Sequence, residues 1–186
     1  MESFRGFIAV EIPTTDIIGS IEQSLMGTGA NIKCVSPENI HITLKFLGQT
    51  PLHRINDIES IMRKSLKGIK PHSIKLSGMG VFPNEQYVKI IWIGIKQSDY
   101  LCTIATRLND LLNSIGFKRE KRTFSAHLTL ARMRSSRGKD QVLGILHQYK
   151  DTTFATVPVQ EITLKKSTLS PKGPIYETIT SIPLSS

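Results

Sequence analysis

The sequence is poor in cysteine, aromatic side chains and acidic residues, and it contains no long hydrophobic run. Two cysteines, Cys34 and Cys102, are too few for a disulfide-stapled scaffold. No apolar segment approaches the ~18 residues of a membrane-spanning helix, so we expect no membrane association. The N-terminus lacks the charged, apolar and small-residue regions of a signal peptide. We therefore expect a cytoplasmic protein with reduced thiols.

The excess of basic over acidic residues points toward anionic partners. The chain has 24 Lys and Arg against 15 Asp and Glu, which gives a formal net charge of +9. Its pI of about 9.7 is in the range typical of nucleic-acid-binding domains. A basic pI also occurs in proteins that bind no nucleic acid, so charge alone does not decide the function.

Apolar spacing predicts the same order of elements in both halves of the chain. For the first half we expect a strand at 4–12, a helix capped within 14–16 and running to 25, a strand at 39–47, a helix at 51–66 and a strand at 72–79. For the second half we expect a strand at 87–95, a helix at 99–115, a strand at 123–131, a helix at 140–149 and a strand at 159–165. A shift of about 86 residues overlays the two series.

An internal repeat of this kind predicts an α+β fold of two similar lobes, each an antiparallel sheet backed by helices. The lobes would be related by a pseudo-two-fold, with the active-site cleft between them. We expect one bilobal domain over 1–186, with repeat-like halves at about 1–81 and 86–170 and a C-terminal strand at 174–182. The turn-like segment 78–85 between the halves predicts tight packing. We expect a monomer, because the duplication supplies both halves of the cleft.

Two tetrapeptides, HITL and HLTL, share the pattern His-x-Thr-Leu. They place His41 and Thr43 in the first half, and His127 and Thr129 in the second. Alternate residues of a strand face one side, so each motif presents an imidazole and a hydroxyl together. A single motif of this length is more often structural than functional. Two copies at matching places favour a catalytic role, because a structural repeat has no need to keep both polar groups.

The two motifs together suit phosphoryl chemistry. Histidine has an ordinary pKa near ~6.5, so one neutral ring can accept a proton while one charged ring donates a proton. Threonine hydroxyls can donate hydrogen bonds to phosphoryl oxygens. Two histidines without nearby Cys, Asp or Glu fall short of the three protein ligands of a catalytic zinc site. We therefore expect no metal and no cofactor. The sequence does not say which histidine is the acid.

The motifs and their flanks resemble the RNA 2′,3′-cyclic phosphodiesterases, also called 2′-5′ RNA ligases, of the two-histidine phosphoesterase superfamily. The resemblance rests on segments 4–10, 37–48, 80–83, 91–94, 124–132 and 167–176. Two departures are Ala126, where the family usually has proline before the second histidine, and Cys34-Val35, where an aromatic residue is common.

The resemblance implies hydrolysis of a terminal RNA 2′,3′-cyclic phosphate to a 2′-phosphate, with 2′-5′ ligation as a related reaction. It implies that His41 is the proton donor and His127 the proton acceptor. The implied partner is RNA with cyclic phosphate ends. The sequence does not distinguish between tRNA fragments, splicing intermediates and small cyclic nucleotides as the physiological substrate.

Further residues are candidates for substrate binding. Arg132 adjoins the second motif, and Arg5, Lys45 and Lys172 could also contact RNA phosphates. Phe46 and Tyr176 could stack on a base, although such residues are more often part of the core. Other basic residues after the second motif could bind phosphate or form a solvated loop: Arg134, Arg137 and Lys139.

Two other functions can be weighed against catalysis by paired histidines. An ATP-dependent ligase would need a nucleotide-accepting lysine motif or a glycine-rich phosphate loop, and the sequence contains neither. A non-catalytic basic RNA-binding module stays open. It would bind RNA in a salt-dependent way without turnover.

Overall fold

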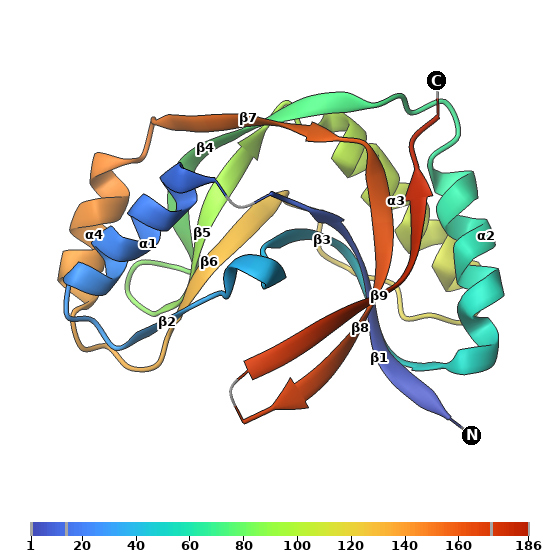
Figure 1. The fold of residues 1–186 in the computed structure, drawn as a ribbon, viewed down its shortest axis with the longest axis horizontal. Coiled ribbons are helices and arrows are strands. Elements are labelled where there is room, and N and C mark those ends of the chain that lie inside the picture. Colours follow the sequence, from blue (N-terminus) through green and yellow to red (C-terminus); the bar gives the residue numbers. More distant parts are fainter. Residues whose placement is uncertain (1, 14, 172, 186) are drawn as a thin grey trace.

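The computed structural model describes residues 2–13, 15–171 and 173–185, which form two antiparallel sheets with helices on their outer sides (Figure 1). Sheet A has the strand order β3 (His41–Pro51), β1 (Ser3–Glu11), β8 (Glu161–Ser170) and β9 (Gly173–Pro183). Sheet B has the order β2 (Ile32–Cys34), β6 (His127–Met133), β5 (Val88–Lys96), β4 (His72–Pro83) and β7 (Thr153–Val159). The predicted α+β fold of two sheets backed by helices is confirmed.

Each sheet is covered by a pair of helices. α2 (Ile55–Ser65) and α3 (Asp99–Ser114) pack on each other and on strands of sheet A. α1 (Asp16–Gly27) and α4 (Lys139–Gln148) pack on each other and on strands of sheet B. Figure 1 shows these pairs at opposite ends of the molecule. Within the described ranges, no helix is long and apolar enough to cross a membrane.

The two sequence halves and the two lobes divide the chain differently. In sequence order, β1, α1, β3, α2 and β4 correspond to β5, α3, β6, α4 and β8. In space, β4 and α1 join sheet B, whereas β8 and α3 join sheet A. The orders β3-β1-β8-β9 and β6-β5-β4-β7 therefore match position by position, and each half contributes to both lobes.

The two halves exchange elements between the lobes because of the connection between β4 and β5. Segment 78–85, expected to separate two lobes, forms the end of β4 and the start of a tight turn. A short turn joins neighbouring antiparallel strands, so β4 pairs with β5, with Phe82 opposite Ile90. The other boundaries also differ in detail. Residues 123–126 precede the strand that begins at His127, and 153–159 form a strand that we did not expect.

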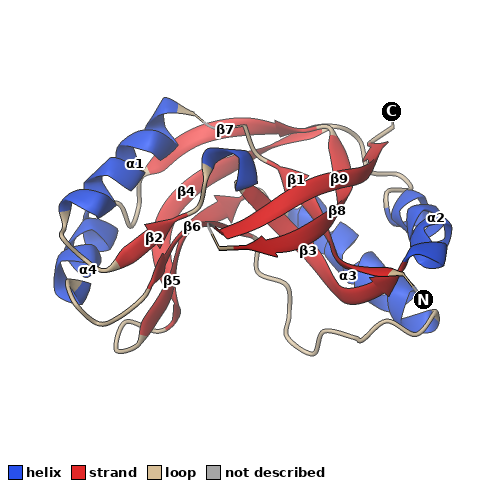
Figure 2. Cartoon of the chain, turned by 60° about the horizontal axis from the view of Figure 1, so that its bottom comes forward, coloured by secondary structure: helices blue, strands red, loops and turns tan. Residues whose placement is uncertain are grey.

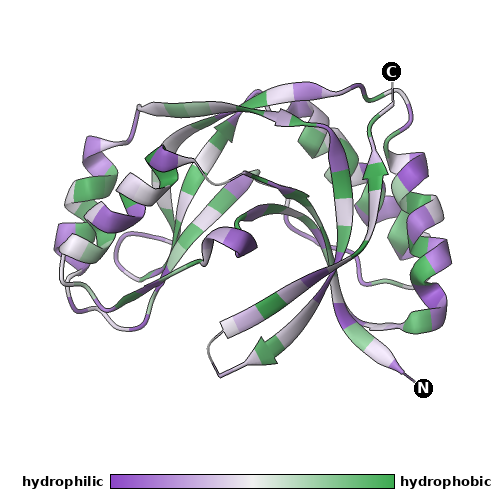
Figure 3. Cartoon of the chain, in the orientation of Figure 1, coloured by the Kyte–Doolittle hydropathy of each residue, from purple (hydrophilic) through white to green (hydrophobic). Residues whose placement is uncertain are grey.

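Periodic apolar faces hold the sheets and helices together. Along β3 and β6, the motif residues Ile42 and Leu128 are fully buried beneath the helices. The face of α3 carrying Leu101, Ile104 and Leu108 is also fully buried. Figure 3 shows hydrophobic and hydrophilic residues alternating along these elements, as amphipathic helices and strands require.

The connected ends of β8 and β9 lie beside the short helix Pro37–Asn39 that precedes the first motif (Figure 2). Asn39 Nδ2 donates a hydrogen bond to the Pro174 carbonyl oxygen over 3.1 Å. Asn39 itself is buried. This contact fixes the start of β3 against the β8–β9 hairpin, which carries Tyr176.

Candidate active site

A β-bulge follows the first motif and determines which side chains share the face of His41. In the β1–β3 ladder, Ala9 pairs with Thr43, and the next pair joins Ile8 to Lys45. Leu44 is therefore the extra residue, and Leu44 and Lys45 are both buried. The bulge moves Lys45 to the helix-covered face of sheet A.

The second motif carries a bulge at the same position. In the β5–β6 ladder, Trp92 pairs with Thr129, and the next pair joins Ile91 to Ala131. The extra residue is Leu130, and both Leu130 and Ala131 are fully buried. Strict alternation from His127 would place Arg132 on the opposite face. The bulge instead returns Arg132, like Phe46 in sheet A, to the face of its histidine.

Each histidine makes the same kind of local hydrogen bond, to the backbone carbonyl oxygen two residues before it. His41 Nδ1 donates to the Asn39 carbonyl oxygen at 2.7 Å, and His127 Nδ1 donates to the Ser125 carbonyl oxygen at 2.8 Å. A carbonyl oxygen can only accept, so the proton of each neutral ring is assigned to Nδ1. Nε2 of each ring is then the atom available for proton transfer. Thr43 Oγ1 donates to Nε2 of His41 at 2.9 Å.

Aromatic rings enclose His41 in sheet A. The His41 ring centroid lies 5.0 Å from that of Phe7 and 5.3 Å from that of Tyr176. Phe46 lies 6.5 Å from Phe7 and is 62% exposed, so its ring can reach a ligand. The predicted candidates Phe46 and Tyr176 therefore lie in one cluster with the first histidine.

A separate pair of rings packs on His127 in sheet B. Phe82 meets His127 edge-on at 5.0 Å, and the Trp92 centroid lies 6.5 Å from the imidazole. A Cβ atom added at Gly80 would overlap the Trp92 indole, so this close approach requires glycine. Trp92 thus helps position the second histidine.

Two charged residues that sequence reasoning missed act on His41. Burial lowers the pKa of His41, the bond to the Asn39 carbonyl opposes that shift, and the nearby Lys165 ammonium lowers the pKa further. Glu11, opposite His41 in the β1–β3 ladder, raises this pKa, and Lys165 Nζ donates a hydrogen bond to Glu11 Oε1. No motif in the sequence marks either residue.

Electrostatic interactions also link groups of the two lobes. A positive charge on His127 lowers the pKa of His41, so the two imidazoles lie within each other's field. Burial raises the pKa of Tyr176, and the guanidinium groups of Arg132 and Arg5 oppose this shift. The predicted candidates Arg132 and Arg5 thus lie near Tyr176 and supply positive charge from both sheets.

Lys45 lies away from this cluster. Its ammonium group donates to Asn109 Oδ1 at 2.8 Å and to the Lys118 carbonyl oxygen at 2.7 Å. The side chain therefore points toward α3 and the segment that follows it, and only 2% of the residue is exposed. Lys172, another candidate, lies outside the described residues.

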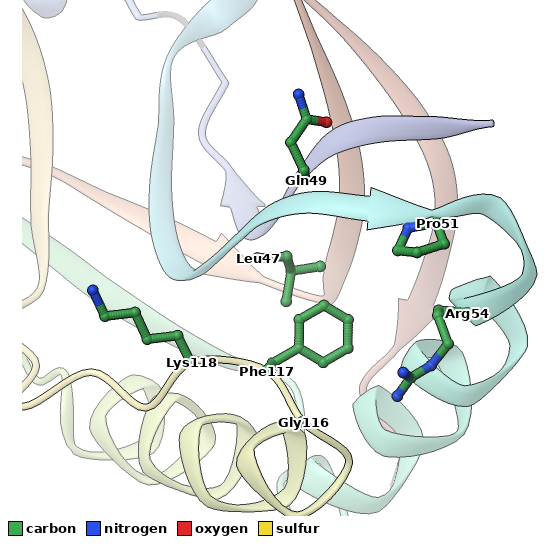
Figure 4. Close-up of a pocket in the computed structure, with 7 residues that line it drawn as sticks. All are labelled: Leu47, Gln49, Pro51, Arg54, Gly116, Phe117 and Lys118. Atoms are coloured by element: carbon green, nitrogen blue, oxygen red, sulfur yellow. The ribbon is translucent and has the colours of Figure 1, made fainter. Parts of the chain in front are cut away.

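Two cavities lie outside the histidine cluster. One of about 200 Å³ lies between the end of β3 and the segment after α3 (Figure 4). There the Arg54 guanidinium lies 5.3 Å from the centre of the Phe117 ring and donates to Asp57 and to the Ile115 carbonyl oxygen. The second, of about 430 Å³, lies beyond the second motif and shares Arg132 with the region around Tyr176.

Comparison with known proteins decides the family. A family model described as AKAP7 2′5′ RNA ligase-like domain matches residues 7–184. This chain belongs to the 2′-5′ RNA ligase-like family. An RNA 2′,3′-cyclic phosphodiesterase of Archaeoglobus fulgidus is 36% identical to this family member over 175 residues, covering 93% of this chain and 96% of the relative. The Methanothermobacter thermautotrophicus protein of the same name is 33% identical over 174 residues, covering 92% and 94%.

Solved structures confirm the fold of this family member. The protein TT0787 of Thermus thermophilus superposes with a TM-score of 0.80 at 24% identity, covering 97% of both chains. Escherichia coli LigT, solved with 3′-AMP, superposes with a TM-score of 0.77 at 20% identity over the full length of both. The family model and the curated relatives confirm the predicted resemblance over nearly the whole chain, and the solved structures confirm its fold.

Proposed function

We propose that this 2′-5′ RNA ligase-like protein hydrolyses the 2′,3′-cyclic phosphate ends of RNA to 2′-phosphates. The matched environment of the two histidines carries the proposal. In each histidine, Nδ1 donates a hydrogen bond to the carbonyl oxygen two residues upstream, which leaves Nε2 as the atom that can exchange a proton with the substrate. The electrostatic coupling of His41 and His127 supports their action on one phosphate. The cyclic phosphodiesterases among its relatives support the substrate class.

In the proposed reaction, His127 Nε2 accepts a proton from a water molecule that attacks phosphorus. The bond between phosphorus and the 3′-oxygen breaks, and His41 Nε2 donates a proton to that oxygen. Thr43, Thr129 and the Tyr176 phenol donate hydrogen bonds to the non-bridging oxygens, and the Arg132 guanidinium balances their negative charge. The product carries a 2′-phosphate and a free 3′-hydroxyl.

The lowered pKa of His41 must be reconciled with its role as the donor. In the free protein, burial and the Lys165 charge favour the neutral ring. The cyclic phosphate brings a negative charge next to the ring, and an adjacent opposite charge favours the protonated form. In the alternative that the lowered pKa favours, His41 is the proton acceptor and His127 is the proton donor. The pH dependence of the reaction in a Lys165 variant distinguishes these two assignments.

Ligation and metal independence are part of the same proposal. A 5′-hydroxyl in place of water, deprotonated by the same base, would attack phosphorus and leave a 2′-5′ linkage. The two imidazoles are fewer than the three protein ligands of a catalytic zinc site, and threonine hydroxyls are not among the usual zinc ligands. We propose a monomer that acts without a metal on RNA with cyclic phosphate ends, such as tRNA fragments, because one chain supplies both motifs.

Turnover of a short RNA ending in a 2′,3′-cyclic phosphate, with EDTA and without ATP, tests the proposal. We expect a 2′-phosphate product and a loss of about 10²–10⁴-fold in kcat for His41→Ala and for His127→Ala, because each removes a proton-transfer group. Thr43→Ala and Thr129→Ala should cost about 10²-fold. The control is His53→Ala, which alters an exposed histidine before α2.

Two outcomes would contradict the proposal in different ways. A 3′-phosphate product would agree with catalysis at this site but would show that the 2′-oxygen, and not the 3′-oxygen, is the leaving group. Salt-dependent RNA binding without turnover, unchanged in both histidine variants, would instead support the non-catalytic binding module.

A further inference from the structure

The second cavity, of about 430 Å³, lies where β5 begins and β6 ends. Its walls come from the β4–β5 turn and the start of β5, from the end of β6, and from the segment that leads into α4. The lining residues that carry the argument are Tyr87, Lys89, Arg132, Arg134 and Lys139. None of the described residues in this lining is acidic.

The chemistry of the walls favours an anionic, aromatic ligand. Four of the lining side chains are cationic, and Lys89 Nζ lies 4.9 Å from the centre of the Tyr87 ring. The Tyr87 residue remains 61% exposed. The neighbouring Glu85 carboxylate faces His147, with 3.4 Å between Oε1 and Nε2. An exposed ring flanked by cations is the arrangement on which single-stranded nucleic acids stack their bases while phosphates meet the charges.

Arg132 connects this cavity to the histidine cluster. It lines the cavity, and its charge also acts on Tyr176, whose ring contacts His41. Arg134 lies seven positions beyond His127, which corresponds to about 20 Å along an extended strand. The nucleotide whose cyclic phosphate lies at the histidines therefore does not itself fill this cavity. A different nucleotide of the same RNA strand can occupy it.

We propose that this cavity is a second nucleotide-binding subsite, which takes a base and phosphate of single-stranded RNA upstream of the cyclic phosphate end. Tyr87 stacks on the base, and Lys139 and Arg134 bind the backbone phosphate. The inference rests on the proposed function, since it assumes that the reacting phosphate lies at the histidines. Its consequence is a preference for oligonucleotides over cyclic mononucleotides.

The test compares a 2′,3′-cyclic mononucleotide with a tetranucleotide that ends in the same cyclic nucleotide. We expect Tyr87→Ala and Lys139→Ala to lower kcat/KM for the tetranucleotide by about fivefold or more, while mononucleotide turnover keeps the level of the unsubstituted protein. Tyr87→Phe should keep the stacking and the tetranucleotide preference. Lys64→Ala, which removes an exposed charge from α2 in the other lobe, is the charge-matched control.

Salt dependence gives an independent readout. If Lys139 contacts a phosphate, Lys139→Ala should reduce the slope of log(kcat/KM) against log salt for the tetranucleotide by about 0.7, whereas Tyr87→Ala should leave that slope unchanged. Equal ratios of tetranucleotide to mononucleotide turnover in all variants would overturn the subsite and leave the proposed function intact. If the unsubstituted protein turned over neither substrate, the proposed function would fail. Affinity for a tetranucleotide with a 3′-hydroxyl would then decide the subsite, and equal affinity in Tyr87→Ala would overturn it.

Discussion

At the scale of single residues, the environment of His41 is a balance of opposing charges. Burial, Lys165 and His127 lower its pKa, whereas Glu11 and the Asn39 carbonyl raise it. The sequence identified the histidines because their motif is repeated. It could not identify the charged pair, because Glu11 is placed opposite His41 by strand register and Lys165 is brought in from the far end of the chain.

Replacing Lys165 should move the pH dependence of the reaction. Lys165→Met removes a charge that lowers the pKa of His41 and leaves the Glu11 carboxylate unpaired, and both changes raise that pKa. The limb of the kcat/KM profile that reports His41 should therefore shift to higher pH. If His41 is the proton donor, the rate falls as pH rises through its pKa, and the alkaline limb moves. If His41 is the base, the acidic limb moves.

The neighbouring Lys166 supplies the control for this shift. Lys166 Nζ pairs with Glu177 at 3.1 Å on a more exposed surface, and Lys166→Met should leave both limbs in place. A profile of Lys165→Met in which neither limb moves would show that this lysine does not tune the first histidine.

At the scale of elements, the bulges explain which predicted side chains lie on the face of each histidine and which do not. Alternation correctly predicts that each histidine shares a face with the threonine two positions later. It also predicts Lys45 on that face, and the bulge at Leu44 overturns this. A bulge arises from pairing with a neighbouring strand, so a pattern within one strand does not reveal it.

The buried ammonium of Lys45 donates hydrogen bonds to α3 and to the segment that leads to the second motif, and these bonds hold that segment in place. Lys45 binds Asn109 and the Lys118 carbonyl, and the Asn109 amide exchanges two hydrogen bonds with the Glu120 backbone. This segment runs from α3 in one lobe to His127 in the other. Lys45 is thus a positioning residue that connects the two motif strands.

Lys45→Met tests this structural role against substrate binding. Loss of the ammonium removes two hydrogen bonds made by a buried charged group, and we expect the free energy of unfolding in urea to fall by about 1–3 kcal/mol. KM for cyclic-phosphate RNA and its salt dependence should stay unchanged. Arg132→Met is the matched comparison, and it should raise KM and flatten the salt dependence. A flatter salt dependence for Lys45→Met would indicate that this lysine does contact RNA.

At the scale of the whole molecule, the exchanged elements make the two lobes interdependent. The repeat of five elements could be predicted from the periodicity of the sequence. Their partition between the sheets could not, since it depends on which strands pair across the midpoint of the chain. β4 has β5 and β7 as its neighbours, and both come from the second half. In return, β8 of the second half lies next to β1 of the first.

Separated halves should therefore fail to fold. We expect fragments 1–85 and 86–186 to lack native far-UV circular dichroism and dispersed amide signals when each is alone, because each leaves strands without partners. The intact chain should unfold in urea in a single transition detected alike by circular dichroism and by Trp92 fluorescence. A fragment with native-like signals on its own, or two separated transitions, would contradict this interdependence.

For the proposed reaction, we expect the paired bulges to decide which end of the substrate each lobe recognises. Two strictly identical His-x-Thr strands would offer the same groups from both sides, and a bound substrate could be turned around without penalty. The residue that each bulge returns to the histidine face differs between the copies, Phe46 in sheet A and Arg132 in sheet B. A ring attracts a base, and a guanidinium attracts a phosphate. In the proposed reaction, duplication thus supplies matched groups for proton transfer, and the two bulges make the two sides of the site different.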